Sequence, residues 1–179
     1  MKYLFLIFVV LFSGCSQKSY IYIDEPKLSV IKKNDISLGV KEISLPYYLD
    51  DAKIPYVKNS KIEFFKNSEF SSDASEFATK RAMDILRASL TSRVYEYPFS
   101  NGAVNYILDI EIRKFITVKN RVELKAFWRL FDKNKRLIKS STYHDSILLK
   151  DFSAQECAKG MQILYDRFIK NIARKLSEI

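Results

Sequence analysis

The chain has 179 residues, a net charge of +9, two cysteines and a single histidine. This length suits one domain with a sizeable core, and so few cysteines and histidines exclude a scaffold built on disulfides or a His/Cys metal cluster. We expect the positive charge to meet anionic lipid headgroups or an acidic partner rather than nucleic acid. Because the basic residues are spread along the chain, the alternative is that much of the charge only solvates the surface.

The N-terminus has the three parts of a secretory signal. Lys2 supplies the positive charge, Tyr3 to Phe12 form the apolar run, and Ser13-Gly14 precede Cys15. The run is too short to span a bilayer, which takes about 20 residues. We therefore predict that residues 1–14 are removed, which takes away one lysine and no acid and leaves a net charge of +8.

A cysteine directly after two small residues is typical of a lipobox, so Cys15 is the predicted lipidation site and would carry palmitate-type acyl chains. The alternative is an ordinary signal with a cysteine near the cut. Ser16, not aspartate, follows Cys15, which favours the outer membrane under the sorting rule of enteric bacteria. We assign 15–34 to a lipidated tether and 35–179 to a single domain.

The first part of the domain is predicted to hold two strands separated by a loop. Alternating apolar residues from Ile36 to Ile43 predict a strand. Pro46 and Pro55 interrupt regular structure, so we interpret 44–60 as an ordered loop. Lys61 to Phe65 is a short strand candidate.

A helix is predicted next, from about Ala74 to Arg93. Asp73 and Glu76 have capping-box spacing ahead of apolar residues that recur every three to four positions. Tyr97-Pro98 and Asn101-Gly102 break the chain after it.

Two segments then alternate clearly between apolar and polar residues, from Tyr106 to Ile112 and from Val122 to Leu130. A three-residue loop, Lys119-Asn120-Arg121, keeps both apolar sets on one side. It pairs Ile112 with Trp128, Ile110 with Leu130 and Glu111 with Arg129. A two-residue loop would place Ile112 opposite Phe127, so we predict the longer loop.

A third strand, Leu137 to Leu148, and a second helix, about Ser153 to Ser177, complete the chain. The helix has an apolar face formed by Cys157, Met161, Leu164, Phe168, Ile172 and Leu176. This order of elements predicts an α+β fold: an antiparallel sheet with both helices packed on one face.

No catalytic residue, metal site or cofactor site is predicted. Phosphate loops and nucleophile elbows are absent from the sequence, and a serine hydrolase would have to use His144. Cys157 is better explained as a small core residue. Calcium at Asp50-Asp51 lacks a supporting loop pattern, so a solvated turn is the better interpretation.

Three phenylalanines, Phe115, Phe127 and Phe131, fall on the polar parity of the predicted hairpin. With helices on one face of the sheet, these rings would lie on the other face beside Arg113 and Arg129. Exposed aromatic residues rimmed by charge mark interfaces. Coverage by the loop 44–60 within the same subunit is the alternative.

The chain resembles the auxiliary lipoproteins of ABC-type transport systems, of the PqiC (paraquat-inducible protein C) or YmbA type. The resemblance covers about residues 20–177. The matching features are, in order, Leu45-Pro46-Tyr47-Tyr48-Leu49-Asp50, Ile54, the helix 74–93, Tyr97-Pro98, Tyr106, Ala126-x-Trp128-x-Leu130 and the C-terminal helix.

This resemblance implies a non-catalytic outer-membrane lipoprotein that works with an MCE-domain protein in phospholipid transport between membranes. It also implies a fold like the N-terminal domain of TolB, and it allows assembly into a homo-oligomeric ring. Two other functions fit the sequence: an envelope-assembly accessory for lipopolysaccharide or secretion machinery, and a lipoprotein hydrolase that uses His144.

Overall fold

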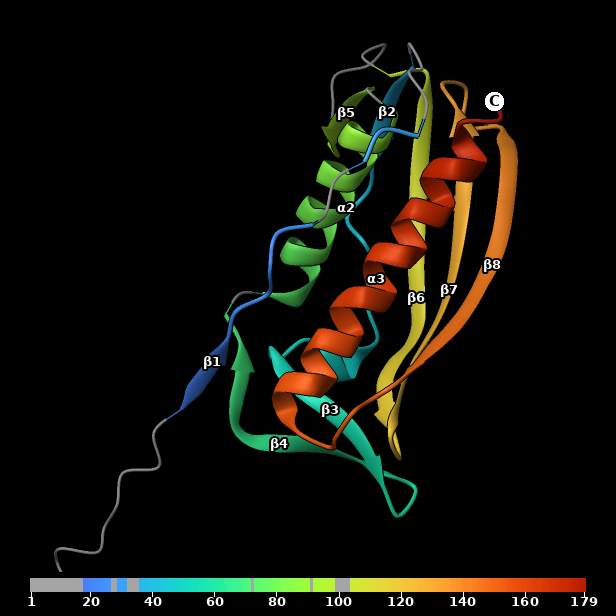
Figure 1. Ribbon diagram of the computed structural model, residues 1–179. Coiled ribbons are helices and arrows are strands. Elements are labelled where there is room, and N and C mark those ends of the chain that lie inside the picture. The colour runs from blue at the N-terminus through green and yellow to red at the C-terminus, as the bar shows by residue number, and fades with distance from the viewer. Residues whose placement is uncertain (1–17, 27–28, 32–35, 72, 91, 99–103) are drawn as a thin grey trace, which may run out of the picture.

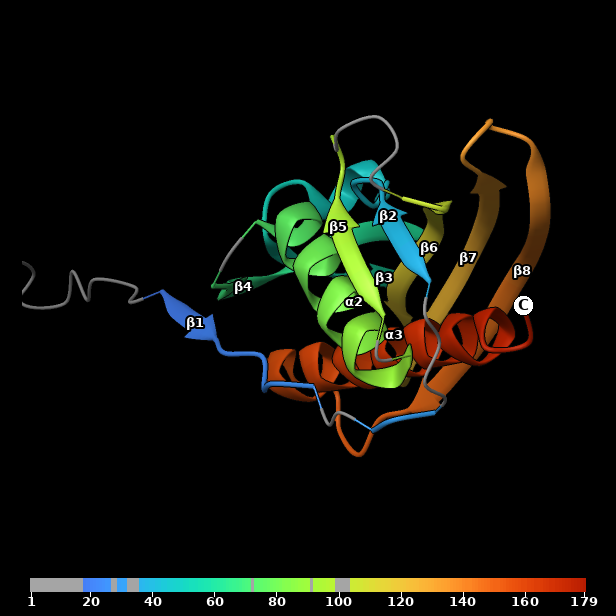
Figure 2. The ribbon, with the colours of Figure 1, turned by 90° about the horizontal axis from the view of Figure 1, so that it is seen from above.

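The computed structural model describes residues 18–26, 29–31, 36–71, 73–90, 92–98 and 104–179. Two helices lie against a curved sheet, and both are on the same side of it (Figures 1 and 2). The elements in chain order are β1 (Ser19–Ile21), β2 (Ser37–Val40), η1 (Tyr47–Leu49), β3 (Lys53–Lys58), β4 (Lys61–Phe70), α2 (Ala74–Leu90), β5 (Arg93–Glu96), β6 (Tyr106–Val118), β7 (Arg121–Asp132), β8 (Leu137–Leu148) and α3 (Ala154–Leu176).

The sheet is mixed, which corrects the expectation of a purely antiparallel one. β6, β7 and β8 form an antiparallel meander, and β3 pairs antiparallel with β4. On the other edge of β6, β2 and β3 run parallel to it, while β5 pairs parallel with β2 and β1 with β4. Between β2 and β6 the chain crosses over through α2, and such a crossover returns the strand in the parallel direction.

Both predicted helices are confirmed, and both begin at a predicted residue. The Asp73 carboxylate accepts the backbone N–H of Glu76 at 3.0 Å, and the Ser153 hydroxyl accepts that of Glu156 at 3.3 Å. The predicted apolar face of α3, from Cys157 to Leu176, is buried. Neither helix in the described part of the chain is long and apolar enough to cross a bilayer.

The segment 44–60, expected to be a loop, contains the 3-10 helix η1 and the strand β3. Pro55 lies within β3, next to a shift in the β3–β4 register between Lys53 and Pro55. A proline is tolerated at such an irregularity because it has no N–H to contribute to the ladder. β4 extends to Phe70, beyond the predicted end at Phe65. β5 was not predicted because, of its four residues, only Val94 is buried.

The β6–β7 hairpin has a two-residue turn and a bulge instead of the predicted three-residue loop. Val118 pairs with Arg121 around Lys119-Asn120, and Lys119 adopts the left-handed conformation. The register then shifts between Ile112 and Lys114, so Ile112 pairs with Ala126 and Ile110 with Trp128. The extra residue at the bulge restores the match between the apolar faces that the short turn alone would lose.

The bulge also moves Phe115 into the core, which corrects its expected place on the outer face. Phe115 pairs with the buried Leu124, is 7% exposed and stacks on Tyr165 of α3 at 6.5 Å between ring centroids. Its backbone N–H donates to the Tyr48 hydroxyl at 3.0 Å, so η1 is tied to the edge of β6.

α3 lies closest to the sheet at Gly160. A Cβ atom there would lie 2.8 Å from both Leu149 Cδ2 and Val122 Cγ2. Glycine inside a helix is normally about 1 kcal/mol less favourable than alanine, so this close approach is the reason for it.

We predict that Gly160→Ala lowers the melting temperature by about 2–4 °C, which corresponds to about 1 kcal/mol. The strain of overpacking against the fully buried Val122 exceeds the gain in helix propensity. Thermal unfolding followed by circular dichroism measures the shift. Lys159→Ala, at the exposed neighbouring position, serves as the control and should change stability little. A melting temperature raised by Gly160→Ala would contradict the prediction.

Candidate partner interface

The face of the meander that points away from the helices carries a cluster of rings and charges. The alternation of β7 turns Ala126, Trp128 and Leu130 toward the core and leaves the residues between them on the outer side. We call this cluster the outer patch, and its members are Lys41, Asp109, Glu111, Arg113, Phe127, Arg129 and Phe131.

The Phe127 ring lies within the outer patch and contacts two guanidinium groups. The guanidinium carbons of Arg113 and Arg129 lie 5.0 and 5.7 Å from its centroid. The ammonium of Lys41 lies 6.0 Å from the centroid of Phe131. Both rings are half-buried, and such cation–π contacts hold the long basic side chains in place over them.

Carboxylates from β6 orient the two arginines. Arg113 donates from Nε and Nη2 to the two oxygens of Glu111, at 2.9 and 3.3 Å, and Arg129 Nη2 donates to Asp109 Oδ2 at 2.8 Å. The hydrogen bond from Arg113 holds the pKa of the Glu111 carboxyl below its ordinary value and raises the pKa of the arginine. The shifts in pKa favour the charged forms of both Glu111 and Arg113.

This arrangement suits recognition by another protein. Arginine and aromatic side chains are enriched at protein–protein interfaces, and rings held rigid before binding lose little conformational entropy when a partner covers them. Of the five residues predicted to form the interface, Phe127, Phe131, Arg113 and Arg129 lie together on this face, and Phe115 does not.

A hydrolytic site around His144 has poor geometry. His144 is exposed on β8, and its neighbour Asp145 points to the opposite face of the strand. The Asp145 carboxylate instead accepts a hydrogen bond from the Tyr143 hydroxyl at 3.1 Å. Cys157 is a buried thiol whose pKa burial raises, and no group of three potential metal ligands occurs among the described residues. Cys15 lies outside the described residues.

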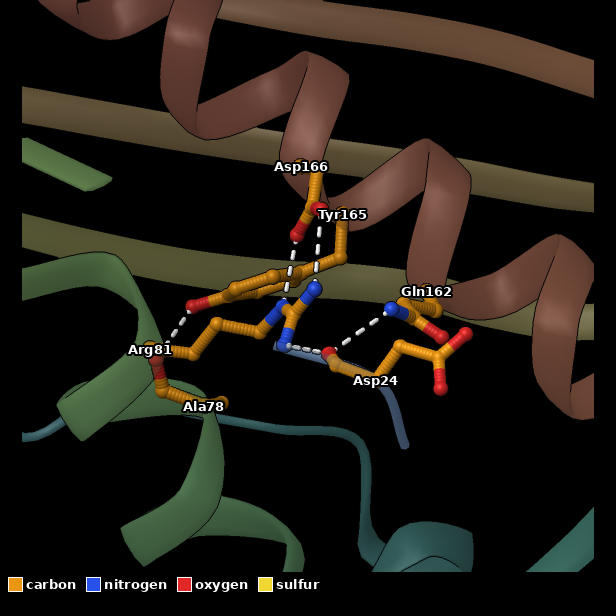
Figure 3. A network of polar contacts seen from close by, with 6 residues as sticks. All are labelled: Asp24, Ala78, Arg81, Gln162, Tyr165 and Asp166. Atoms are coloured by element: carbon orange, nitrogen blue, oxygen red, sulfur yellow. Dashed lines mark hydrogen bonds and ion pairs between the residues drawn. The ribbon is translucent and has the colours of Figure 1, made fainter. Parts of the chain in front are cut away.

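Sequence reasoning missed a buried polar network between the two helices, which Figure 3 shows. Arg81 of α2 donates from Nε and Nη2 to the carboxylate of Asp166 on α3, at 2.6 and 2.8 Å. Its Nη1 donates to the backbone carbonyl of Asp24 at 2.7 Å, and Gln162 Nε2 donates to the same carbonyl at 2.9 Å. The side chain of Arg81 is only 4% exposed.

This network fixes the segment after β1 onto the helices. Beside it, the Tyr165 hydroxyl donates to the Ala78 carbonyl at 2.6 Å, and burial raises the pKa of Tyr165 well above its ordinary value. A small apolar cavity of about 60 Å³ remains under the segment, between Ile23 and Phe70. One feature of the sequence could have indicated this network. Arg81 falls at helical spacing among the apolar residues of α2, so its charged side chain lies on the buried face of the helix and needs a buried partner.

The fold is that of a class of small α+β proteins known from crystal structures. The protein XCC0632 from Xanthomonas campestris is 13% identical, with a TM-score of 0.73 over 87% of this chain and 93% of that one. A structure titled only as an uncharacterized protein is 17% identical, with a TM-score of 0.70 over 83% of this chain and all of that one. The hypothetical protein CT253 from Chlamydia trachomatis is 11% identical, with a TM-score of 0.50 over 78% and 96%.

Residues 24–173 match the family described as the ABC-type transport auxiliary lipoprotein component. The match extends over most of the chain, and the protein therefore belongs to this family. No curated protein matches the sequence. The matched range begins at Asp24, the residue whose carbonyl Arg81 and Gln162 hold.

We predict that Arg81→Met lowers the free energy of unfolding by about 3 kcal/mol, because it leaves the Asp166 carboxylate largely buried without its partner. The double variant Arg81→Met/Asp166→Leu should recover more than half of this loss, since it removes both charges. Chemical denaturation measures the three values. Lys80→Met, one residue away on the exposed side of α2, removes an exposed ion pair with Glu76 and should leave the free energy of unfolding almost unchanged. Equal losses for Arg81→Met and Lys80→Met would contradict a buried network.

Proposed function

We propose that the protein is a non-catalytic outer-membrane lipoprotein subunit of an MCE/ABC-type system that transports phospholipid between membranes. Acyl chains on Cys15 anchor it after residues 1–14 are removed, and the domain docks to the periplasm-spanning MCE component. The observation that carries this proposal is the family match over residues 24–173, because the family supplies auxiliary lipoproteins to ABC-type transporters.

Two further observations support the proposal. The lipobox ending in Ser13-Gly14-Cys15 is the arrangement that lipidation requires, and Ser16 favours transfer to the outer membrane. The outer patch offers an oriented surface of rings and guanidinium groups for a protein partner. We infer that this surface contacts the MCE component, with the Phe127 ring at the centre of the contact.

The partner is identified by purification of the tagged full chain from membranes of the native host in mild detergent. We expect an MCE-domain protein to be recovered together with an ABC ATPase and its permease. Cys15→Ala should release the protein from the membrane fraction. Recovery of an outer-membrane barrel or a secretion component in their place would favour the envelope-assembly function and contradict this one.

We predict that Phe127→Ser/Phe131→Ser weakens capture of the MCE component by at least about tenfold, because central aromatic residues carry most of the binding energy at such interfaces. Quantitative mass spectrometry of the purified material measures the recovery. Tyr95→Ser removes an exposed aromatic residue from the edge strand β5, outside the outer patch, and should leave capture unchanged. Circular dichroism checks that both variants fold. Unchanged capture by the folded double variant would place the docking surface elsewhere.

A further inference from the structure

One end of the molecule is densely basic. It contains the β3–β4 turn and the β6–β7 turn, which lie together at the bottom of Figure 1 because Val57 pairs with Val118. The loop after β8 joins them, since the N–H of Leu149 donates to the Asn120 carbonyl at 2.8 Å. We call this surface the basic end, and its exposed cations are Lys58, Lys61, Lys66, Lys119, Arg121 and Lys150.

None of the six cations of the basic end makes an ion pair within the described part of the chain. They outnumber the carboxylates nearby, which are Glu63, Glu123 and Asp151, and Glu123 is already paired with Lys114 at 2.7 Å. Lys58 and Lys61 also face each other directly across the β3–β4 turn. Like charges directly opposite each other destabilise a hairpin, so the presence of two lysines at these positions is not explained by the stability of the domain.

The first described strand, β1, pairs with the C-terminal residues of β4, the strand whose N-terminal end forms part of the basic end. β1 begins at Ser19, four residues after Cys15, and Ser19 pairs with Ser68 of β4. Four extended residues span at most about 14 Å. Beyond β1, Arg81 and Gln162 hold the Asp24 carbonyl, so the segment from β1 to Asp24 is fixed to the domain at both of its ends.

Exposed aromatic residues accompany the charges. Tyr20 and Tyr22, within and just after β1, are 65% and 74% exposed. Phe152 is half-exposed and packs against Tyr56 and Phe65, with ring centroids 5.2 and 5.3 Å away. Aromatic side chains with one polar and one apolar end favour the boundary between water and lipid.

We propose that the basic end lies against the anionic phospholipid headgroups of the leaflet that holds the acyl chains. This inference rests on the anchor at Cys15 in the proposed function and adds an orientation to it. Basic residues within about 10 Å of an anionic surface are attracted to it, and a connection of at most about 14 Å from Cys15 to β1 keeps the domain close to the bilayer. The β7–β8 turn, at the opposite end of the molecule in Figure 1, then points away from the bilayer.

A depth measurement on the lipidated full chain tests the orientation. Fluorophores are attached to Ile62→Cys at the basic end or to Leu137→Cys at the opposite end; both residues are exposed, and Cys157 is buried. The protein is reconstituted into phosphatidylcholine vesicles with or without phosphatidylglycerol, and quenching by lipid-attached spin labels is recorded. With phosphatidylglycerol present, we expect the label at position 62 to be quenched at least about threefold more than the label at position 137.

Charge-reversal variants separate the basic end from basic charge in general. Lys58→Glu/Lys61→Glu/Lys66→Glu should abolish the difference in quenching between the two labels. The matched control, Lys133→Glu/Lys135→Glu/Arg136→Glu, removes three exposed cations from the β7–β8 turn and should preserve it.

Several outcomes would overturn the proposal. Equal quenching of the two labels in vesicles that retain the protein would reject the orientation while leaving the anchor intact. The same quenching with and without phosphatidylglycerol would reject recognition of anionic headgroups. Failure of the protein to float with the vesicles would reject the anchor, and with it both the proposed function and this inference.

Discussion

A single buried guanidinium, that of Arg81, connects the three parts of the chain that have to be fixed relative to one another. It bridges α2 to α3 through Asp166, and it holds the Asp24 carbonyl, which belongs to the segment after β1. A planar group with five donors in a fixed fork can satisfy a carboxylate and a carbonyl at once, which a lysine could not do with the same geometry. The path of the N-terminal segment depends on this contact, because Arg81 holds Asp24 and so determines where the segment after β1 lies on the domain.

The fixed position of the segment after β1 bears on both surfaces to which we assign a role, the basic end and the outer patch. Since the segment after β1 is held on the helices and β1 pairs with β4, the proposed anchor joins the domain at a fixed place, the start of β1. The outer patch lies on the face of the sheet opposite the helices, where Phe127 contacts the guanidinium groups of Arg113 and Arg129. A chain anchored at Cys15 would therefore present the basic end to lipid and leave the outer patch accessible to a partner.

The sequence was sufficient for features that depend on local periodicity. The apolar residues of α3 repeat every three to four positions, and Asp73 and Ser153 mark where the helices begin, so both starts and the end of α3 were predicted closely. The predicted end of α2 at Arg93 was wrong, because α2 ends at Leu90 and Arg93 begins β5. The outer positions of Phe127 and Phe131 followed from the alternation of β7. Membership of the auxiliary lipoprotein family followed from the order of short motifs along the chain, and the match over residues 24–173 confirms it.

Features that depend on distant parts of the chain could not be predicted in this way. The parallel pairing of β2 with β6 requires a crossover through α2, and the bulge near Arg113 corrects a register that a two-residue turn alone would break.

Hydrogen exchange of the full chain, followed by mass spectrometry, tests the role of Arg81 most directly. Amides of residues 19–24 should be protected, and Arg81→Met should speed their exchange by about tenfold or more while the amides in the middle of β7 remain protected. Exchange of residues 19–24 at the rate of an unfolded peptide in the wild-type protein would contradict the account.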